Sequence, residues 1–281
     1  MTQRTLTILS SVLFTSLFSL TLGYAQNSIL GNNIFSPILV TGDGVNASGT
    51  YWAHGGNIYL LTAKHVILKD STTFTSSQMT LKSYSSSGSG AQQCVLDIDL
   101  NQALKSRELR AHKTHDIALV RIGHDTVISG SHLIEFLRHV TPKAIATTGI
   151  MTASAVTLFE SAIVSNDAFA LGYPAAIGIP HIPQLDYSQP LLRRGIVAGK
   201  NYINRTLIID SPSYPGNSGG PVFEVDETDD GRTMRLIGVV SQFIPFQEIW
   251  YNRPFGYQNQ QISNSGYTVV VPMDFAFDLI R

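Results

Sequence analysis

The sequence has little charge, almost no cysteine and few segments with helical spacing. Cys94 is the only cysteine among 281 residues, so no disulfide can form within the chain, and a redox or cysteine-ligated metal function is disfavoured. Lys and Arg total 19 against 20 Asp and Glu, which excludes the strong field that attracts nucleic acid or an anionic membrane. With 43% apolar residues, we expect one large globular unit, or two small ones sharing an interface.

The first 25 residues have the features of an export signal. Arg4 precedes an uncharged stretch from Thr5 to Gly23, and the small residues Gly23 and Ala25 suit cleavage before Gln26. An uncleaved membrane anchor is the alternative, but the many hydroxyl residues in this stretch weaken it. We expect 1–25 to be a signal peptide and 26–281 the mature domain. Export without a disulfide fits a secreted or periplasmic bacterial protein with no stable membrane association after cleavage.

Short apolar or alternating runs recur between clusters of Gly, Asn, Ser and Pro, which is typical of β-barrels or a sandwich. These runs are Ile38–Val40, Asn57–Ala63, Ile117–Ile122, Thr206–Asp210, Val222–Val225, Met234–Val240 and Tyr267–Val271. Helical spacing is confined to 133–140 and 273–280. We expect the Ser- and Thr-rich stretch 71–90 to be a mobile loop and the acidic stretch 226–231 to be a hairpin turn.

Ser218 lies in the glycine-rich stretch "YPGNSGGPVF", which fits three kinds of nucleophile site. The G-x-S-x-G elbow needs a later histidine, and the last histidine is His181. In a subtilisin-like order an aspartate precedes the histidine, as Asp43 precedes His65. That site requires a helix after the serine, whereas Pro221 and a strand-like run follow here. The order His, Asp, Ser is the remaining one.

The sequence supplies this third order in suitable surroundings. His65 closes the strand-like "IYLLTAKHV", and Asp116 opens "HDIALVRI". A serine hydroxyl needs a base to become a nucleophile, and histidine takes and returns a proton near neutrality. Asp116 would hold the required tautomer of His65. We therefore predict His65, Asp116 and Ser218 as catalytic residues, with the N–H groups of Gly216 and Ser218 as the oxyanion hole.

With these motifs the chain resembles the chymotrypsin-like (trypsin-like) serine peptidases, most closely the bacterial members that share G-N-S-G-G-P with the HtrA proteases. The matching segments are "LTAKHV", "HDIALVRI", "ALGYP", "PGNSGGPV" and "LIGVVSQF". This resemblance implies an all-β fold of two six-stranded β-barrels, at about 35–150 and 151–281. It also implies an active site in the cleft between the barrels and a short C-terminal helix. Ser241 would lie near the triad, on a strand that pairs with the substrate backbone.

Two positions depart from the best-known members of this family. Asn217 stands where digestive peptidases carry the acid that pairs with a new amino terminus, so we expect no zymogen switch and a turn held by other contacts. Pro212 stands where trypsin carries the acid that selects basic side chains. Pro212, together with Ser213, Gln242 and Phe243, indicates a substrate pocket for a small or medium uncharged side chain. We also expect no PDZ domain, because the residues after the nucleophile are needed to complete the second barrel.

These features predict an exported serine endopeptidase that cleaves protein or peptide substrates through an acyl-enzyme intermediate, without a metal or other cofactor. His112, His115 and His124 form no closed ligand set, so ordinary surface or supporting roles suit them better than metal binding. Two alternatives stay open. One is a catalytically silent binding protein with a protease fold, and the other is an esterase or narrow processing enzyme that uses the same triad.

Overall fold

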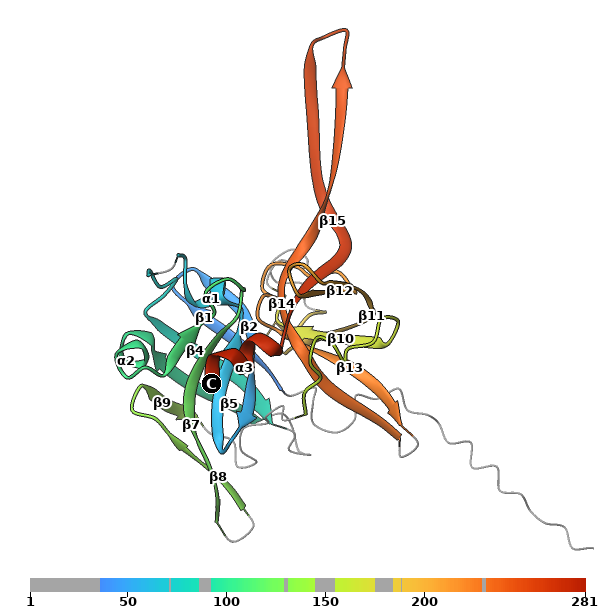
Figure 1. The fold of residues 1–281 in the computed structure, drawn as a ribbon. Helices are drawn as coiled ribbons and strands as arrows, with labels where there is room; N and C mark the ends of the chain where they lie inside the picture. The colour runs from blue at the N-terminus through green and yellow to red at the C-terminus, as the bar shows by residue number, and fades with distance from the viewer. Residues whose placement is uncertain are drawn as a thin grey trace, which may run out of the picture.

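The computed structural model describes residues 36–70, 72–85, 92–128, 131–144, 155–174, 184–187, 189–228 and 231–281. Its regular structure is nearly all β and forms two sheets side by side (Figure 1). The helices are short: α1 (Lys64–Ile67), α2 (Leu100–Lys105) and α3 (Asp274–Ile280). The all-β class and the C-terminal helix are thus confirmed. The predicted signal peptide lies outside the described residues, and in the described part of the chain no helix is long and apolar enough to cross a membrane.

The N-terminal sheet has nine antiparallel strands around a central path of six. The central order is β7-β3-β2-β1-β4-β5, with β6 and β8 paired to β7, and β9 paired to β5. The pairings among the described residues leave this path open. Its strands are β1 (Pro37–Gly42), β2 (Val45–His54), β3 (Asn57–Thr62), β4 (Gln78–Ser85), β5 (Gln92–Asp99), β6 (Leu109–Ala111), β7 (Ala118–Ile128), β8 (Ser131–Phe136) and β9 (Val140–Ala144).

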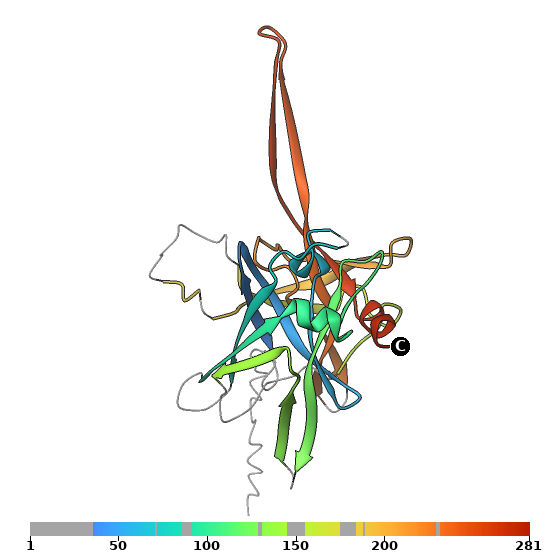
Figure 2. The ribbon, with the colours of Figure 1, turned by 90° about the vertical axis from the view of Figure 1, so that its left-hand side faces the viewer.

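The C-terminal sheet is a closed six-stranded barrel with the order β10-β11-β12-β15-β14-β13. Its strands are β10 (Asp167–Gly172), β11 (Leu191–Asn201), β12 (Thr206–Asp210), β13 (Pro221–Thr228), β14 (Gly231–Asn252) and β15 (Tyr257–Pro272). The two longest strands, β14 and β15, continue far beyond the barrel as a two-stranded hairpin, seen from two sides in Figures 1 and 2. The six-stranded barrel expected for this half is confirmed, and the hairpin is an addition to it.

The predicted strand runs all overlap strands. Of the acidic stretch 226–231, residues 226–228 end β13 and Gly231 begins β14, and these two strands pair antiparallel up to Thr228 and Gly231. The helix predicted at 133–140 is wrong. Its apolar residues recur at helical spacing, but residues 131–136 form β8, which pairs in a hairpin with β7. The strand pairing satisfies the backbone there, and tertiary context overrides the local pattern.

The loop predicted at 71–90 is also wrong for part of its length. Residues 78–85 form β4, an interior strand paired with both β1 and β5. Met79 and Leu81 alternate with polar residues and are buried, so this segment carries the period-two pattern of a half-buried strand. The abundance of Ser and Thr around it hid that pattern.

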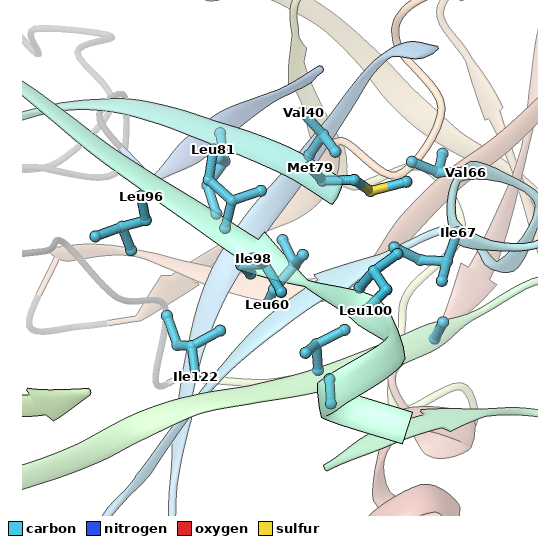
Figure 3. Packing of buried hydrophobic residues seen from close by; sticks show 14 of the residues in the cluster. Val40, Leu60, Val66, Ile67, Met79, Leu81, Leu96, Ile98, Leu100 and Ile122 are labelled. Atoms are coloured by element: carbon cyan, nitrogen blue, oxygen red, sulfur yellow. The ribbon is translucent and has the colours of Figure 1, made fainter. Parts of the chain in front are cut away.

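Three buried clusters hold the fold together. One fills the N-terminal sheet, where Leu60, Leu81 and Leu96 point into a common space (Figure 3). A second fills the barrel. The third joins the two, because it combines Trp52 from β2 with Phe223 from β13 and other residues of both sheets and α3. Full burial of one such side chain contributes about 1.5–3 kcal/mol, so this shared cluster fixes how the two sheets meet.

An ion pair in the N-terminal sheet should make stability depend on acid. Arg121 Nε donates to Glu108 Oε2 at 2.6 Å, and a second nitrogen of Arg121 donates to the other oxygen. These hydrogen bonds lower the pKa of Glu108, against the effect of burial, which raises it. Because the pKa is lower in the folded state, the stabilisation is complete above the unfolded-state pKa and is lost as pH falls through the folded-state value.

Glu108→Gln should therefore lower the free energy of unfolding at pH 7 by about 1–3 kcal/mol and weaken its decline below about pH 4.3. Urea unfolding at a series of pH values measures both effects. Glu135→Gln is the control, since Glu135 has no ion-pair partner among the described residues. An unchanged pH dependence in Glu108→Gln would contradict the assignment.

Candidate active site

His65 and Asp116 are brought together by two neighbouring strands. His65 lies in α1, directly after β3, and Asp116 lies just before β7, which pairs with β3. The sequence placed His65 at the end of a strand, whereas it lies in a single helical turn after that strand. Its Nδ1 is 2.8 Å from Asp116 Oδ2, and its backbone N–H donates to Oδ1 at 2.9 Å. A carboxylate only accepts, so Nδ1 carries the proton and Nε2 of the neutral ring is a free base.

The Asp116 carboxylate also receives a hydrogen bond from the other sheet. Ser241 Oγ, on β14, donates to Asp116 Oδ2 at 2.6 Å. Burial raises the pKa of Asp116, but hydrogen bonds from His65 and Ser241 and the charge of a protonated His65 outweigh this effect and lower the pKa below its ordinary value. Asp116 therefore stays ionised beside His65 at neutral pH.

Ser218 lies in the turn between β12 and β13, facing the same cleft. The cleft has a volume of about 1110 Å³ and is lined by His65, Asp116, Ser218 and Ser241, among other residues. Ser218 Oγ donates to the backbone carbonyl of Ser241 at 3.4 Å. No hydrogen bond joins Ser218 to His65 among the described residues. The structure thus brings the three predicted residues to one cleft, with the hydroxyl of Ser218 turned toward β14.

The turn around Ser218 leaves two backbone N–H groups without an acceptor. Gly216 and Gly219 have φ values of 99° and 82°, which glycine adopts without strain. The N–H groups of Asn217, Gly219 and Gly220 donate to backbone carbonyls at 2.7–2.9 Å. Those of Gly216 and Ser218 have no acceptor within the described part of the chain. Unpaired backbone donors are rare in a buried segment, so this pair is available for a ligand.

Ser48, on β2, holds this turn from the N-terminal sheet. Its Oγ donates to the carbonyl of Gly216 at 2.7 Å and accepts from the N–H of Tyr173 at 2.8 Å. Its own N–H donates to the carbonyl of Ser218 at 2.9 Å. These are contacts of the kind expected to hold the turn without an acid at position 217. Sequence reasoning missed Ser48, because no local motif marks a residue whose partner lies 168 positions away.

Gly219 and Thr62 explain why the turn can lie so close to β2. A Cβ on Gly219 would be 2.0 Å from Thr62 Oγ1 and 2.3 Å from the carbonyl oxygen of Ser48. Any side chain at this position would push the turn away from the N-terminal sheet. The absence of a side chain at Gly219 therefore permits the close approach of β2.

The predicted substrate-binding residues divide into two groups. Ser213, Ser241, Gln242 and Phe243 line the cleft. Pro212 is half-buried and does not line it. Asp116 is the one carboxylate among the described lining residues, and it is occupied by its hydrogen bonds.

The three histidines considered above for metal binding, His112, His115 and His124, make other contacts in the structure. His115 lines the cleft and stacks on Phe275 of α3, with ring centroids 3.4 Å apart. His112 packs against His115, and burial, followed by the charge of His115, lowers the pKa of His112. His124 lies in β7, opposite Asn57. In the described ranges, no three His, Cys, Asp or Glu side chains are placed to hold a metal ion.

A comparison with family models identifies the class of protein. The model described as the trypsin-like peptidase domain matches residues 47–232. The chain therefore belongs to the trypsin-like peptidase family. The match covers His65, Asp116 and Ser218.

Among solved structures, the chain matches an HtrA-type protease, AlgW, determined with a decapeptide. The identity is 15% and the TM-score 0.44, and the match covers 83% of this chain and 49% of the AlgW chain. The chain thus spans about half of the AlgW chain. The thermostable serine protease AL20 from an extremophilic microorganism matches at 14% identity and a TM-score of 0.49, covering 88% and 95% of the two chains. Anisep from Arthrobacter nicotinovorans matches at 15% identity and a TM-score of 0.45, covering 84% and 88%. No curated protein matches the sequence.

Proposed function

We propose that the chain is an exported serine endopeptidase in which His65, Asp116 and Ser218 form the catalytic triad. The observation that carries this proposal is the convergence of the hydrogen-bonded His65–Asp116 pair and Ser218 on one cleft. Membership of the trypsin-like peptidase family supports it. The export part of the proposal rests only on the sequence of residues 1–25, which has the features of a signal peptide.

In this mechanism His65 is the general base. Its Nε2 takes the proton of Ser218 as the hydroxyl attacks the scissile carbonyl, and it later gives the proton to the leaving amine. Asp116 keeps the proton on Nδ1 and stabilises the imidazolium that forms. For this step the Ser218 hydroxyl must leave the Ser241 carbonyl and turn toward His65. The present contact, at 3.4 Å, is a weak one. Catalytic hydrogen bonds often tighten only when substrate is bound.

The two unpaired N–H groups of the turn supply the other half of the chemistry. Attack on the carbonyl places negative charge on its oxygen, and the donors of Gly216 and Ser218 are free to receive it. Removal of one such donor typically costs 10²–10³-fold in kcat. Water then attacks the acyl-enzyme by the same route, with His65 again as the base.

The residue recognised next to the scissile bond is expected to be uncharged and of small or medium size. Asp116 is engaged with His65 and Ser241, so no free carboxylate among the described lining residues can pair with Arg or Lys. Ser213, Gln242 and Phe243 supply small, polar and apolar surface to the cleft. A strong preference for basic residues in a peptide-library screen would contradict this part of the proposal.

An active-site-directed organophosphonate provides the decisive test of the triad. We expect stoichiometric labelling of Ser218, located by mass spectrometry of the digested protein, and a loss of labelling in Ser218→Ala and His65→Ala. Ser211→Ala is a matched control, because this serine is buried near the same turn but does not line the cleft. It should label like the unmodified chain. Folded protein that takes up no label would support the binding-protein alternative.

Internally quenched peptides then distinguish an endopeptidase from an esterase. Cleavage of an internal peptide bond, abolished by Ser218→Ala, is the expected result. Turnover of activated esters with no cleavage of any peptide in a diverse library would assign the same triad to ester hydrolysis.

A further inference from the structure

The outer part of the β14–β15 hairpin has no role in the function proposed above. Eight register pairs, from Pro245–Asn264 to Asn252–Tyr257, build this segment, residues 245–264, which we call the distal hairpin. Its strands extend for about 27 Å at 3.4 Å per residue. Figures 1 and 2 show it standing clear of both sheets in two perpendicular views. A two-stranded hairpin without further packing is only marginally stable in water.

The distal hairpin exposes apolar side chains on both of its faces. Side chains alternate along a strand, so Phe246 and Trp250 lie on one face of β14, and Ile249 and Tyr251 lie on the other. The exposed large apolar residues of the segment are Phe246, Ile249, Trp250, Tyr251, Phe255, Tyr257 and Ile262. It carries only two charges, on Glu248 and Arg253. Exposed apolar surface of this density marks an interaction site, and the near absence of charge indicates an uncharged partner.

One edge of this hairpin is continuous with the candidate active site. β13 pairs with β14 as far as Val239, and the turn that follows Ser218 pairs with Val240. From Ser241 onward, no described strand pairs with that edge of β14. Ser241, Gln242 and Phe243 line the cleft, and the same strand then enters the distal hairpin at Pro245. Register shifts at Ser241 and Ile244 are β-bulges, which bend the strand at this junction.

We propose that the distal hairpin binds the protein substrate itself, as an extended segment that pairs with the free edge of β14. This inference rests on the proposed peptidase function and specifies its substrate class. Every pairing between named strands in the structure is antiparallel, and antiparallel pairing is slightly more stable per residue. An antiparallel substrate strand runs from the hairpin tip toward Ser241 and Ser218. The residues that pair with the hairpin therefore lie on the amino-terminal side of the scissile bond.

The chemistry of the segment defines which substrates fit. Strand addition requires free backbone N–H and C=O groups, so the substrate must be unstructured over about eight residues before the cleavage site. Aromatic and aliphatic side chains on both hairpin faces favour apolar residues in that stretch, whereas charged ones gain little. The proposed substrates are unfolded or disordered polypeptides with an uncharged, partly apolar segment upstream of the scissile bond.

A peptide series tests this proposal directly. All peptides share one cleaved core and carry uncharged extensions of zero, four, eight or twelve residues, added to either the amino or the carboxyl side. We expect kcat/KM to rise about tenfold or more with the amino-terminal extension, since each backbone hydrogen bond adds a modest gain. The carboxyl-side extension should have little effect. N-methylation of successive amides in the long extension should reduce kcat/KM at alternate positions, because only every second amide faces the hairpin edge.

A shortened variant separates this proposal from the peptidase proposal. Residues 248–261 are exchanged for Asn-Gly, which closes a two-residue hairpin between the paired Gln247 and Ile262. Organophosphonate labelling and cleavage of the unextended core should stay unchanged, while the gain from the amino-terminal extension is lost. If the variant labels normally and keeps the length dependence, the hairpin does not bind substrate and the inference is wrong. If neither protein labels, the peptidase proposal fails instead.

The oligomeric state in solution tests whether a second copy of the chain, instead of a substrate, occupies this edge of β14. A second copy of the chain could pair with the same edge. In that case light scattering would show a dimer that the shortened variant converts to a monomer, with the length dependence of cleavage unaffected. That combination would overturn the substrate assignment.

Discussion

Asp116→Asn should fold normally and lose about 10⁴-fold in kcat, the loss known for this exchange in a Ser-His-Asp peptidase. Asp116 accepts hydrogen bonds from the backbone N–H and the Nδ1 of His65. The asparagine oxygen can keep the first of these, which leaves its NH₂ group facing Nδ1. An NH₂ group only donates, so the proton of His65 moves to Nε2 and the ring can no longer accept the proton of Ser218. Steady-state turnover of a short peptide measures the effect.

The control for this substitution is Asp167→Asn. Asp167 pairs with Arg194 on the barrel surface, outside the residues that line the cleft, so the same chemical change there should leave kcat unchanged. Circular dichroism and thermal unfolding establish that both variants are folded. A folded Asp116→Asn protein with near-normal kcat would show that Asp116 does not orient the base.

Ser48→Ala should lower kcat by about 10²-fold while changing KM little. The Ser48 hydroxyl holds the Gly216 carbonyl, and the N–H of Gly216 is one of the two free donors in the turn. Without this contact the backbone of Gly216 is held less firmly, which displaces its N–H, and the loss of an oxyanion donor typically costs 10²–10³-fold in kcat. The N–H of Tyr173 also loses its acceptor, so the free energy of unfolding should fall by about 1–3 kcal/mol. Peptide turnover and urea unfolding measure the two effects.

Thr50→Val separates the effect on the turn from a general loss of stability. Thr50 lies on the same strand as Ser48, and its buried hydroxyl donates to the carbonyl of Ser36 at 3.0 Å. Its loss should cost comparable stability and leave kcat unchanged. Equal reductions of kcat in both variants would mean that Ser48 acts only through stability.

The parts of the site that sequence could predict are those encoded by chemistry within a short segment. Ser218 is flanked by glycines whose positive φ values shape the turn, and His65 and Asp116 adjoin strands with clear apolar patterns. The pairing of those strands then brings the two side chains to 2.8 Å. Ser48 could not be predicted, because its role depends on a contact between two sheets and a serine in a strand has no distinguishing pattern of its own.

The strands and helices of the fold also divide into those that the sequence predicts and those that it does not. Strands such as β12 were predictable because their apolar residues face a core, as Leu207 and Ile209 do. The distal hairpin was not, since its side chains alternate without a buried face and Gln or Asn residues fill much of β15. The helix expected at 133–140 failed for the opposite reason. Its spacing is helical, yet pairing with β7 satisfies the backbone more completely than an isolated short helix can.

The hydrogen bond from Ser241 to Asp116 can form only late in synthesis, because its two residues are far apart in the sequence. During synthesis Asp116 leaves the ribosome 125 residues before Ser241, a delay of about 6–25 s at 5–20 residues per second. Phe275, on which His115 stacks, follows later still. Until these residues arrive, Asp116 lacks its hydrogen bond from β14 and the neighbouring His115 lacks its stacking partner in α3. We therefore expect the proposed catalytic base to be complete only when most of the chain has been synthesised.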